Sequence, residues 1–513
     1  MLFIQLSEQY RADCNELVKL FLHENSYIYI EPENDSETDS ECALNSVQDT
    51  MPAGFSTDYG IVNDETILRF DLHHDGNGKF LRGSLNRGNQ VLFQEETPIL
   101  NQKSDPHKDL KMPLKLLLYN LLSRFTGKTL PWGALTGIRP VKIINSLLVQ
   151  GESIDDINRK MQEYYLVSEE KTRLAAEVAL NEDKYLSVPP KSISIYIGIP
   201  FCTSRCLYCS FPSVSTQRCG SLTSDYLKAL EREFCWTTDW MKKHHILLDT
   251  VYIGGGTPTA ISDSEFEKLL MDLVPILPMD SFREYTVEAG RPDTINAAKL
   301  GMMKKAGVSR ISINPQTMHN KTLRLIGRNH TAEQFTDAFH MARQEGFGNI
   351  NCDLIAGLPS ETLEDFQATL EQIMQISPES VTVHTMSLKR ASRLNEEKDS
   401  FTRTDDDTVG EMIDLARVSL CRTGLKPYYL YRQKNILANL ENVGYARPGF
   451  EGIYNILIME EIQSILALGA GAVSKIVYPG NRIERIFNVK NVEQYIQRID
   501  EMLERKRAML ERE

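Results

Sequence analysis

Residues Tyr196–Phe211 read YIGIPFCTSRCLYCSF and carry three cysteines, Cys202, Cys206 and Cys209, in the spacing Cys-x₃-Cys-x₂-Cys directly after an apolar, strand-like run. A closed structural zinc or iron–sulfur site uses four protein ligands, whereas three thiolates on a cubane cluster leave one iron open to bind a reactant. The stretch therefore predicts a cluster-binding loop at the end of a strand. A zinc knuckle completed by a distant His or Cys, or three unrelated core cysteines, are the alternatives.

Apolar strand-like runs continue downstream of this loop, separated by amphipathic helix-like stretches. Near-continuous apolar strands that alternate with helices predict βα units and a parallel sheet, most simply a six-unit partial barrel of the α/β class. In such a barrel, chemistry collects at the C-terminal ends of the strands. The predicted strands are Ser192–Gly198, Thr250–Ile253, Glu284–Glu288, Arg310–Ile313, Asn349–Ile355 and Ser380–His384.

The length of 513 residues suggests three regions, at about 100–200 residues per domain. We expect an N-terminal mixed α/β domain of unassigned role at residues 1–185, the barrel at 186–390, and a C-terminal α-rich region at 391–513. The acidic run Glu31–Glu41 is expected to be a solvated loop. Other local expectations are strands at Ser26–Ile30 and Thr66–Leu72 and helices at Lys111–Phe125 and Val492–Leu510.

Composition limits the classes of partner. The chain has 57 basic and 70 acidic residues and a net charge of −13, which disfavours long-range attraction of nucleic acid. No stretch approaches the ~18 apolar residues of a membrane span, and the opening MLFIQL lacks the features of a signal peptide. An odd number of cysteines, nine, suits a reducing compartment. We therefore expect a cytoplasmic protein whose partner is a small molecule or a protein.

A glycine-rich stretch, Gly254–Thr259 (GGGTPT), follows the strand-like run TVYI. Glycines let a backbone approach a ligand closely, and exposed N–H and C=O groups can hold a zwitterionic amino-acid moiety. By itself the pattern fits a plain tight turn equally well. Its position one βα unit after the cysteine loop favours a binding loop.

These motifs resemble the radical S-adenosylmethionine (SAM) superfamily, and more narrowly the oxygen-independent coproporphyrinogen III oxidase-like family and its HemZ-type branch of coproporphyrinogen dehydrogenases. The resemblance covers residues 190–480. Besides the two motifs above, it rests on the strings YTVEAGRPDTI, RISINPQTMHNKTLRLIGRNH, NCDLIAGLPSET, VTVHTMSLKR, YYLYRQKNILANLENVGYA and LGAGAVSK.

The resemblance implies a radical SAM partial (β/α)₆ barrel that holds one 4Fe–4S cluster through the three cysteines and binds SAM at the open iron. It places Tyr196 beside the cluster-bound SAM, as a catalytic residue together with the cysteines. A desolvated zwitterion needs opposite charges or hydrogen bonds around it. The implied SAM contacts are Gly256, Thr257, Glu288 and Arg328 at the methionine end, Gln316 and Asp353 at the ribose, and Ile355 at the adenine.

The implied activity is oxidative decarboxylation of coproporphyrinogen III to protoporphyrinogen IX without oxygen, in heme biosynthesis, with a low-potential electron donor such as flavodoxin or ferredoxin. One position departs from the coproporphyrinogen-oxidising branch, where a further Cys follows the third ligand after one residue. Here that position is Phe211, as it also is in heme-chaperone relatives. A heme-binding chaperone and a radical SAM enzyme that modifies or degrades heme are therefore the alternatives.

Two strings near the C-terminus, Tyr428–Asn435 (YYLYRQKN) and Gly469–Lys475 (GAGAVSK), combine aromatic, basic and glycine residues. This mixture suits a flat tetrapyrrole with anionic propionates, because basic groups hold carboxylates while aromatic faces cover the ring. Surface cations or structural ion pairs are the alternative interpretation. The candidate propionate-binding residues are Lys389, Arg390, Arg432 and Lys434.

Overall fold

The computed structural model describes most of the chain, in two compact units. One consists of Met1–Gly137 and Glu152–Arg173, and the other of Ile138–Gly151 and Leu174–Glu513. The expected boundaries after residues 185 and 390 divide the chain differently from these two units. They stay a prediction. Arg390, Cys42, Cys219 and nearly all of the acidic run Glu31–Glu41 lie outside the described residues. These are 1–23, 26–31, 65–75, 78–99, 106–137, 139–218, 221–279, 281–389, 392–396, 401, 404–434 and 436–511.

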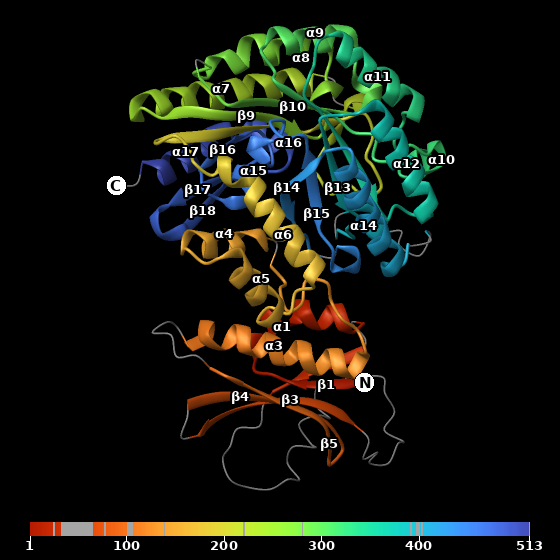
Figure 1. Ribbon diagram of the computed structural model, residues 1–513. Helices are drawn as coiled ribbons and strands as arrows, with labels where there is room; N and C mark the ends of the chain where they lie inside the picture. The colour runs from red at the N-terminus through yellow and green to blue at the C-terminus, as the bar shows by residue number, and fades with distance from the viewer. Residues whose placement is uncertain are drawn as a thin grey trace, which may run out of the picture. The chain divides into compact units, whose positions relative to one another are not determined.

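The first unit is a mixed α/β fold, as expected. Its sheet has the strand order β2-β1-β3-β4-β5, with β1 parallel to β2 and β3 and the later pairs antiparallel. Helices α1 and α3 lie on one face of this sheet (Figure 1) and bury a core that includes Leu17, Leu68 and Leu121. The elements are β1 Leu2–Gln5, α1 Glu8–Phe21, β2 Tyr27–Ile30, β3 Thr66–Asp75, β4 Gly78–Arg87, β5 Gln90–Pro98, α3 Pro106–Thr126 and α5 Ile154–Glu163.

The second unit contains the predicted partial barrel. Its six parallel strands pair in the order β6-β9-β10-β11-β12-β13, and helices cover their outer side (Figure 1). Both faces of the strands are covered, which explains their continuous apolar runs. The elements are β6 Ser192–Ile199, α7 Leu222–His244, β9 Leu247–Gly255, α8 Asp263–Glu267, β10 Glu284–Gly290, α9 Ala297–Lys305, β11 Arg310–Ile313, α10 Asn320–Leu325, α11 Ala332–Gln344, β12 Ile350–Ala356, α12 Leu363–Ile376 and β13 Ser380–Thr385.

Local sequence signals start the crossover helices. A capping box at Thr331 with Gln334 begins α11, and another at Thr362 with Asp365 begins α12. Each box satisfies backbone N–H groups that the first helical turn leaves without partners. Only a short segment separates the end of β12 at Ala356 from the start of α12 at Leu363.

The C-terminal region is helix-rich, as expected, but its strands also extend the barrel sheet at both edges. Beyond β13 come β15 and β14, and beyond β6 come β16, β17 and β18. The predicted helix Val492–Leu510 is two helices, α16 and α17, which meet at Arg498. The elements are α13 Arg393–Glu396, α14 Asp406–Arg422, β14 Lys426–Tyr431, β15 Asn442–Ala446, α15 Ile453–Glu460, β16 Ile465–Leu468, β17 Val473–Tyr478, β18 Arg482–Phe487, α16 Val492–Gln497 and α17 Ile499–Leu510.

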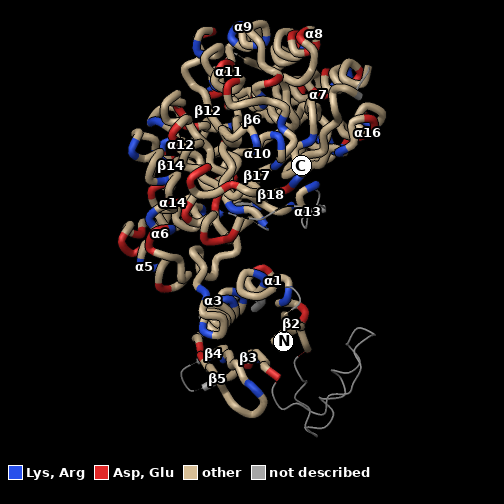
Figure 2. Tube along the Cα trace, turned by 90° about the vertical axis from the view of Figure 1, so that its right-hand side faces the viewer, with Lys and Arg blue, Asp and Glu red and all other residues tan. Residues whose placement is uncertain are grey.

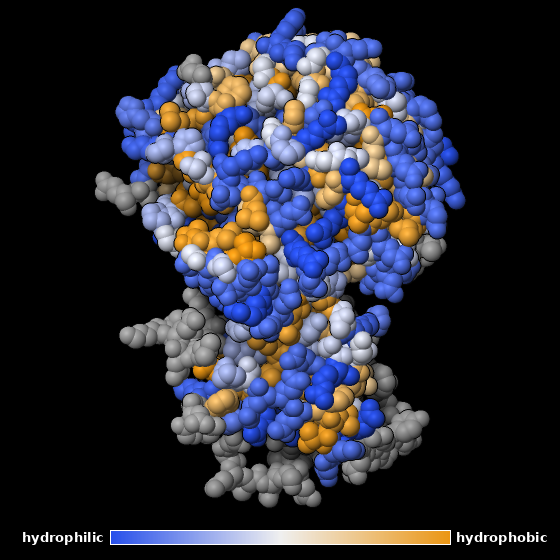
Figure 3. Space-filling view, viewed as in Figure 1, coloured by the Kyte–Doolittle hydropathy of each residue, from blue (hydrophilic) through white to orange (hydrophobic). Residues whose placement is uncertain are grey.

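The surface carries charges of both signs. Lys and Arg residues are interspersed with Asp and Glu along the outer helices of the second unit (Figure 2). The face shown in Figure 3 is mostly hydrophilic, with small apolar areas between the charged residues. Within the described residues, no helix combines the length and the apolar character that crossing a bilayer requires.

Candidate functional site

One cavity of about 620 Å³ opens at the barrel. Its wall comes from the C-terminal ends of the barrel strands, from α15 and from the glycine-rich segment that follows β16. The structure thus brings together residues that are far apart in the sequence. The sequence-predicted residues in its lining are Tyr196, Cys202, Cys206, Cys209, Gly256, Thr257, Glu288, Gln316, Arg328, Asp353, Ile355 and Lys389.

The cysteine loop is fixed by its own backbone. Cys209 donates its N–H to the carbonyl of Cys206 at 3.1 Å, and Leu207 donates to the carbonyl of Ile326 at 2.9 Å. Burial raises the pKa of the Cys202 and Cys209 thiols. A free thiolate is therefore disfavoured at these positions, and a bound metal would compensate for that cost.

The glycine-rich stretch packs backbone to backbone against the cysteine loop. Gly256 donates its N–H to the carbonyl of Ile199 at 2.9 Å, and Thr257 donates to that of Phe201 at 2.7 Å. A Cβ on Gly256 would lie 2.5 Å from the Phe201 carbonyl oxygen and 3.0 Å from the Cys202 sulfur. The stretch is therefore a close-approach loop rather than a plain turn, since only glycine fits there.

Glu288, at the end of β10, is the acidic group of this wall. The hydroxyl of Tyr252 donates a hydrogen bond to its Oε1 at 2.7 Å. Burial raises the pKa of Glu288 to about 7. The rings of Tyr196 and Tyr454 flank this pair, with that of Tyr454 stacked 4.5 Å from the Tyr252 ring. The carboxyl group thus lies in an aromatic, desolvated setting that favours pairing with a cation.

Arg328 supplies a buried positive charge on the same cavity. Its Nη2 donates to the carbonyls of Asn314 at 2.6 Å and Gly290 at 3.3 Å, and its Nη1 donates to the Tyr208 hydroxyl at 3.2 Å. Its Nε is buried and has no hydrogen-bond partner within the described chain. A buried donor without a partner is costly, so this atom suits an anionic ligand.

The opposite wall holds Asp353 and Gln316. Asp353 Oδ1 accepts a hydrogen bond from Asn351 at 2.7 Å, and Oδ2 lies 3.7 Å from His384 Nε2. Burial opposes ionisation of Asp353, but the contacts with His384 and Asn351 and the charge of Arg310 together outweigh it and lower the pKa of that carboxyl. Gln316 has a φ of 69° and exchanges backbone hydrogen bonds with Asp353 and Ile355, each of 3.0 Å. A left-handed residue other than glycine costs energy, and such strain is concentrated at functional sites.

The basic residues proposed for propionates do not all reach the cavity. Lys389 is in its lining, whereas Arg432 and Lys434 are not among the described lining residues. Arg432 is buried and donates to the backbone carbonyl of Asn439 at 3.2 Å. Tyr429, Tyr431 and Gln433 line the cavity. Side chains alternate along an extended chain, and every second residue here faces the cavity. Arg432 has a partner in the protein itself, and Arg432 and Lys434 stay predicted propionate ligands that the described lining does not include.

Comparison with known proteins identifies the family. The model of the radical SAM superfamily matches residues 196–373. The chain is 41% identical over 423 residues to the oxygen-independent coproporphyrinogen-III oxidase-like protein HemZ of Bacillus subtilis (strain 168), covering 81% of this chain and 84% of HemZ. The chain belongs to the radical SAM superfamily, in the coproporphyrinogen oxidase-like family.

Other members of this radical SAM family are more distant. The heme chaperone HemW of Bacillus subtilis (strain 168) is 31% identical over 312 residues, covering 60% of this chain and 76% of HemW. The solved structure of coproporphyrinogen III oxidase (HemN) from Escherichia coli is 23% identical, with a TM-score of 0.49, and covers 63% of this chain and 73% of that chain. The relatives found by sequence therefore include an oxidase-like protein and a chaperone by name.

Membership of the radical SAM superfamily implies a 4Fe–4S cluster and SAM, and the residues present fit both. Within the described chain, no group of three or more His, Cys, Asp or Glu residues is arranged for a single metal ion. A cubane cluster binds each cysteine through a different iron, so its ligands are spaced more widely than those of one ion. The unpaired Nε of Arg328 and the carboxyl group of Glu288, which line the same cavity, fit an amino-acid zwitterion.

Some residues of the radical SAM site were not predicted from the sequence. Tyr252, Tyr454 and His384 line the cavity, and Tyr431 lies 3.2 Å from His384 Nδ1. Tyr252 lies within a predicted strand, and His384 is the last residue of another. The expectation that chemistry collects at the C-terminal ends of strands could therefore have identified His384. Nothing in the local sequence marks Tyr454, because it reaches the cavity from α15.

Proposed function

We propose that Cys202, Cys206 and Cys209 hold one 4Fe–4S cluster and that the protein decarboxylates coproporphyrinogen III oxidatively to protoporphyrinogen IX. The observation that supports this most is the shared cavity, where three cysteines face a separate acidic group and a separate basic group. The similarity to HemZ over 84% of its length supports the choice of substrate.

The methionine end of SAM binds between Glu288 and Arg328 in this proposal. Glu288 pairs with the ammonium group, and the free Nε of Arg328 donates to the carboxylate. Gly256 and Thr257, which line the cavity, contact that end beside the cysteine loop in this proposal. With both cofactors bound, the reduced cluster would supply the electron that splits SAM into methionine and a 5′-deoxyadenosyl radical.

The adenosine end lies against the opposite wall. Asp353 accepts hydrogen bonds from the ribose hydroxyls together with Gln316, and Ile355 contacts the adenine. The contacts with His384 and Asn351 and the charge of Arg310 lower the pKa of Asp353 and favour its ionised form, which is a strong acceptor. Tyr196 covers the reacting end of the molecule from β6.

The tetrapyrrole occupies the rest of the cavity, near Lys389 and the rings of Tyr429 and Tyr431. Each of two propionates loses a hydrogen atom from its β-carbon, which becomes part of 5′-deoxyadenosine. The bond between the propionate's α-carbon and its carboxylate carbon then breaks, and carbon dioxide leaves. One electron passes to an acceptor, and a vinyl group remains on the ring. The chain's own part is to hold that β-carbon near the radical and to exclude water.

A second candidate function is heme binding by a chaperone of the same family. Phe211 favours it, because this residue is 54% exposed, lines the cavity and occupies the position where the oxidising branch has a further cysteine. The 31% identity to HemW points the same way. A heme-modifying or heme-degrading activity would use the same cofactors.

The remaining partners follow from the same chemistry. A low-potential donor such as flavodoxin or ferredoxin reduces the cluster. A reducing cytoplasm keeps the three cysteines available for iron.

The test is mass spectrometry of anaerobic reactions that contain cluster-reconstituted protein, SAM, a strong reductant and either coproporphyrinogen III or heme. Loss of two carbon dioxide units from coproporphyrinogen, together with 5′-deoxyadenosine, supports the oxidase. Unaltered porphyrinogen with stoichiometric heme binding would favour the chaperone, and a changed heme mass would favour a heme-modifying enzyme.

A further inference from the structure

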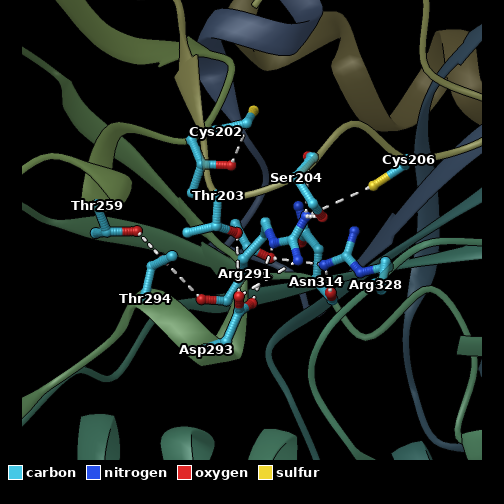
Figure 4. A network of polar contacts seen from close by, with 12 residues as sticks. Cys202, Thr203, Ser204, Cys206, Thr259, Arg291, Asp293, Thr294, Asn314 and Arg328 are labelled. Carbon is cyan, nitrogen blue, oxygen red and sulfur yellow. Dashed lines mark hydrogen bonds and ion pairs between the residues drawn. The ribbon is translucent and has the colours of Figure 1, made fainter. Parts of the chain in front are cut away.

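Arg291 is a buried arginine directly after β10, beneath the cysteine loop (Figure 4). Its side chain is 3% exposed. Its Nη1 donates to the Ser204 hydroxyl at 2.9 Å and to the Ser204 carbonyl at 3.3 Å. The same nitrogen lies 3.8 Å from the Cys206 sulfur, within the range of an N–H···S hydrogen bond. One guanidinium therefore contacts both the backbone of the loop and a cysteine of the proposed cluster site.

The guanidinium is held in a fixed orientation. Its Nε and Nη2 donate to the two carboxylate oxygens of Asp293, at 3.1 Å and 3.3 Å. Asp293 also accepts a hydrogen bond from Thr203 at 3.1 Å, so the pair reaches the loop at a second point. Thr294 donates its hydroxyl to the Arg291 carbonyl at 2.8 Å. Planar, bidentate pairing of this kind leaves Nη1 of the guanidinium to point at the loop. A lysine has a single ammonium group and cannot make both contacts in this geometry.

Contacts to cluster sulfurs affect the electron affinity of the cluster. Hydrogen bonds to the sulfurs and nearby charges set the reduction potential of an iron–sulfur centre. Reduction adds one negative charge to the cluster and its thiolates, and a buried cation stabilises that form more than the oxidised one. Residues that orient metal ligands from behind also change metal affinity.

We infer that Arg291 is a positioning residue for the cluster. Arg291 fixes the cysteine loop at Ser204, and its hydrogen bond to the Cys206 sulfur raises the reduction potential of the cluster. The inference rests on the proposed cluster site, and it adds a role for a residue that contacts neither SAM nor substrate in that proposal. Its consequence is that the low-potential donor reduces the cluster more readily.

The chain offers a matched control at the other end of the same strand. Arg283 immediately precedes β10 and also pairs with an aspartate through two hydrogen bonds, to Asp249 at 2.6 Å and 2.7 Å. The variants Arg291→Lys, Arg291→Met and Arg283→Met separate loss of the sulfur contact from loss of an arginine–aspartate pair on the same strand; the Arg283 side chain is 28% exposed.

The measurement is a redox titration of the reconstituted full-length protein without SAM, followed by electron paramagnetic resonance, together with iron content. We expect a more negative midpoint potential in both Arg291 variants, with the larger shift in Arg291→Met, and an unchanged potential in Arg283→Met. If Arg291→Met holds no cluster, Arg291→Lys supplies the comparison.

Three outcomes would overturn the inference. One is an unchanged potential in the cluster-loaded Arg291 variants, and another is an equal shift in Arg283→Met. The third is failure of both Arg291 variants to assemble a cluster that Arg283→Met still assembles, which would leave Arg291 the fixing of the loop and contradict its inferred effect on the reduction potential. Absence of a cluster from the wild-type protein would instead contradict the proposed function, so the two failures are distinguishable.

Discussion

The hydroxyl of Tyr252 on β9 donates a 2.7 Å hydrogen bond to the carboxylate of Glu288 on the neighbouring strand β10. Burial holds the pKa of Glu288 at about 7, while this hydrogen bond opposes the rise because it favours the charged form. The charge on Glu288 therefore changes within the physiological range of pH.

This relationship predicts pH-dependent binding of SAM. Only ionised Glu288 attracts the ammonium group, so the affinity for SAM rises with pH as the carboxyl loses its proton near pH 7. Tyr252→Phe moves the rise to higher pH. Glu288→Gln lowers the affinity by about tenfold or more and removes the pH dependence, as measured by anaerobic equilibrium dialysis. A pH dependence that persists in Glu288→Gln would assign the titration to another group.

The cysteine loop gives a second prediction. Cys202→Ala, Cys206→Ala and Cys209→Ala each abolish formation of 5′-deoxyadenosine, because a cubane cluster with two thiolate ligands is not held in the required position. Cys235→Ala, which changes an exposed cysteine on α7, keeps the wild-type iron content. Iron analysis and product chromatography measure both effects. Normal 5′-deoxyadenosine from any of the three loop variants would remove that residue from the ligand set.

The close approach of Gly256 to the cysteine loop gives a third prediction. The added Cβ of Gly256→Ala would contact backbone atoms of Phe201 at 2.5 Å and 2.9 Å, so the loop must shift away from Cys202. We expect lower cluster occupancy and SAM affinity. Gly301→Ala, in α9, meets no atom within 4 Å and adds about 0.5–1 kcal/mol of helix stability. Equal cluster occupancy in the two variants would show that the Gly256 contact is not required.

Stability depends on a buried ion pair that fixes the C-terminal helix. Lys506 on α17 pairs with Glu233 on α7, and both side chains are fully buried. Lys506→Met leaves the carboxylate without its cation and lowers the free energy of unfolding by about 3–5 kcal/mol in urea denaturation. Arg232→Met removes the exposed pair with Asp500 between the same helices and costs less than about 1 kcal/mol. Similar losses in both variants would contradict this difference.

The fold of the barrel could be predicted from the sequence, because its strands are covered on both faces and read as apolar runs. The predicted strand Arg310–Ile313 has its observed bounds, and Ser192–Gly198 ends one residue early. The sheet extensions β14–β18 were missed. They belong to antiparallel edges whose pairing partners, such as β13 for β15, are distant in the chain.

The residues of the candidate site could be predicted where a charged residue stands at the C-terminal end of a predicted strand. Glu288 and Asp353 fall at such ends and line the cavity, as expected. Arg291 and Tyr454 were missed, because their roles depend on contacts across the fold rather than on local pattern. Arg432 was chosen because it lies in a string of aromatic and basic residues, but it is absent from the described cavity lining and donates to the carbonyl of Asn439 instead.

The most direct test of the account uses coproporphyrinogen III deuterated at the propionate β-carbons, incubated anaerobically with the reconstituted protein, SAM and reductant. Mass spectrometry then follows the label. The account predicts 5′-deoxyadenosine that carries one deuterium, together with a porphyrinogen that has lost carbon dioxide. Unlabelled 5′-deoxyadenosine with intact coproporphyrinogen would contradict the assigned substrate while leaving the cluster and SAM chemistry in place.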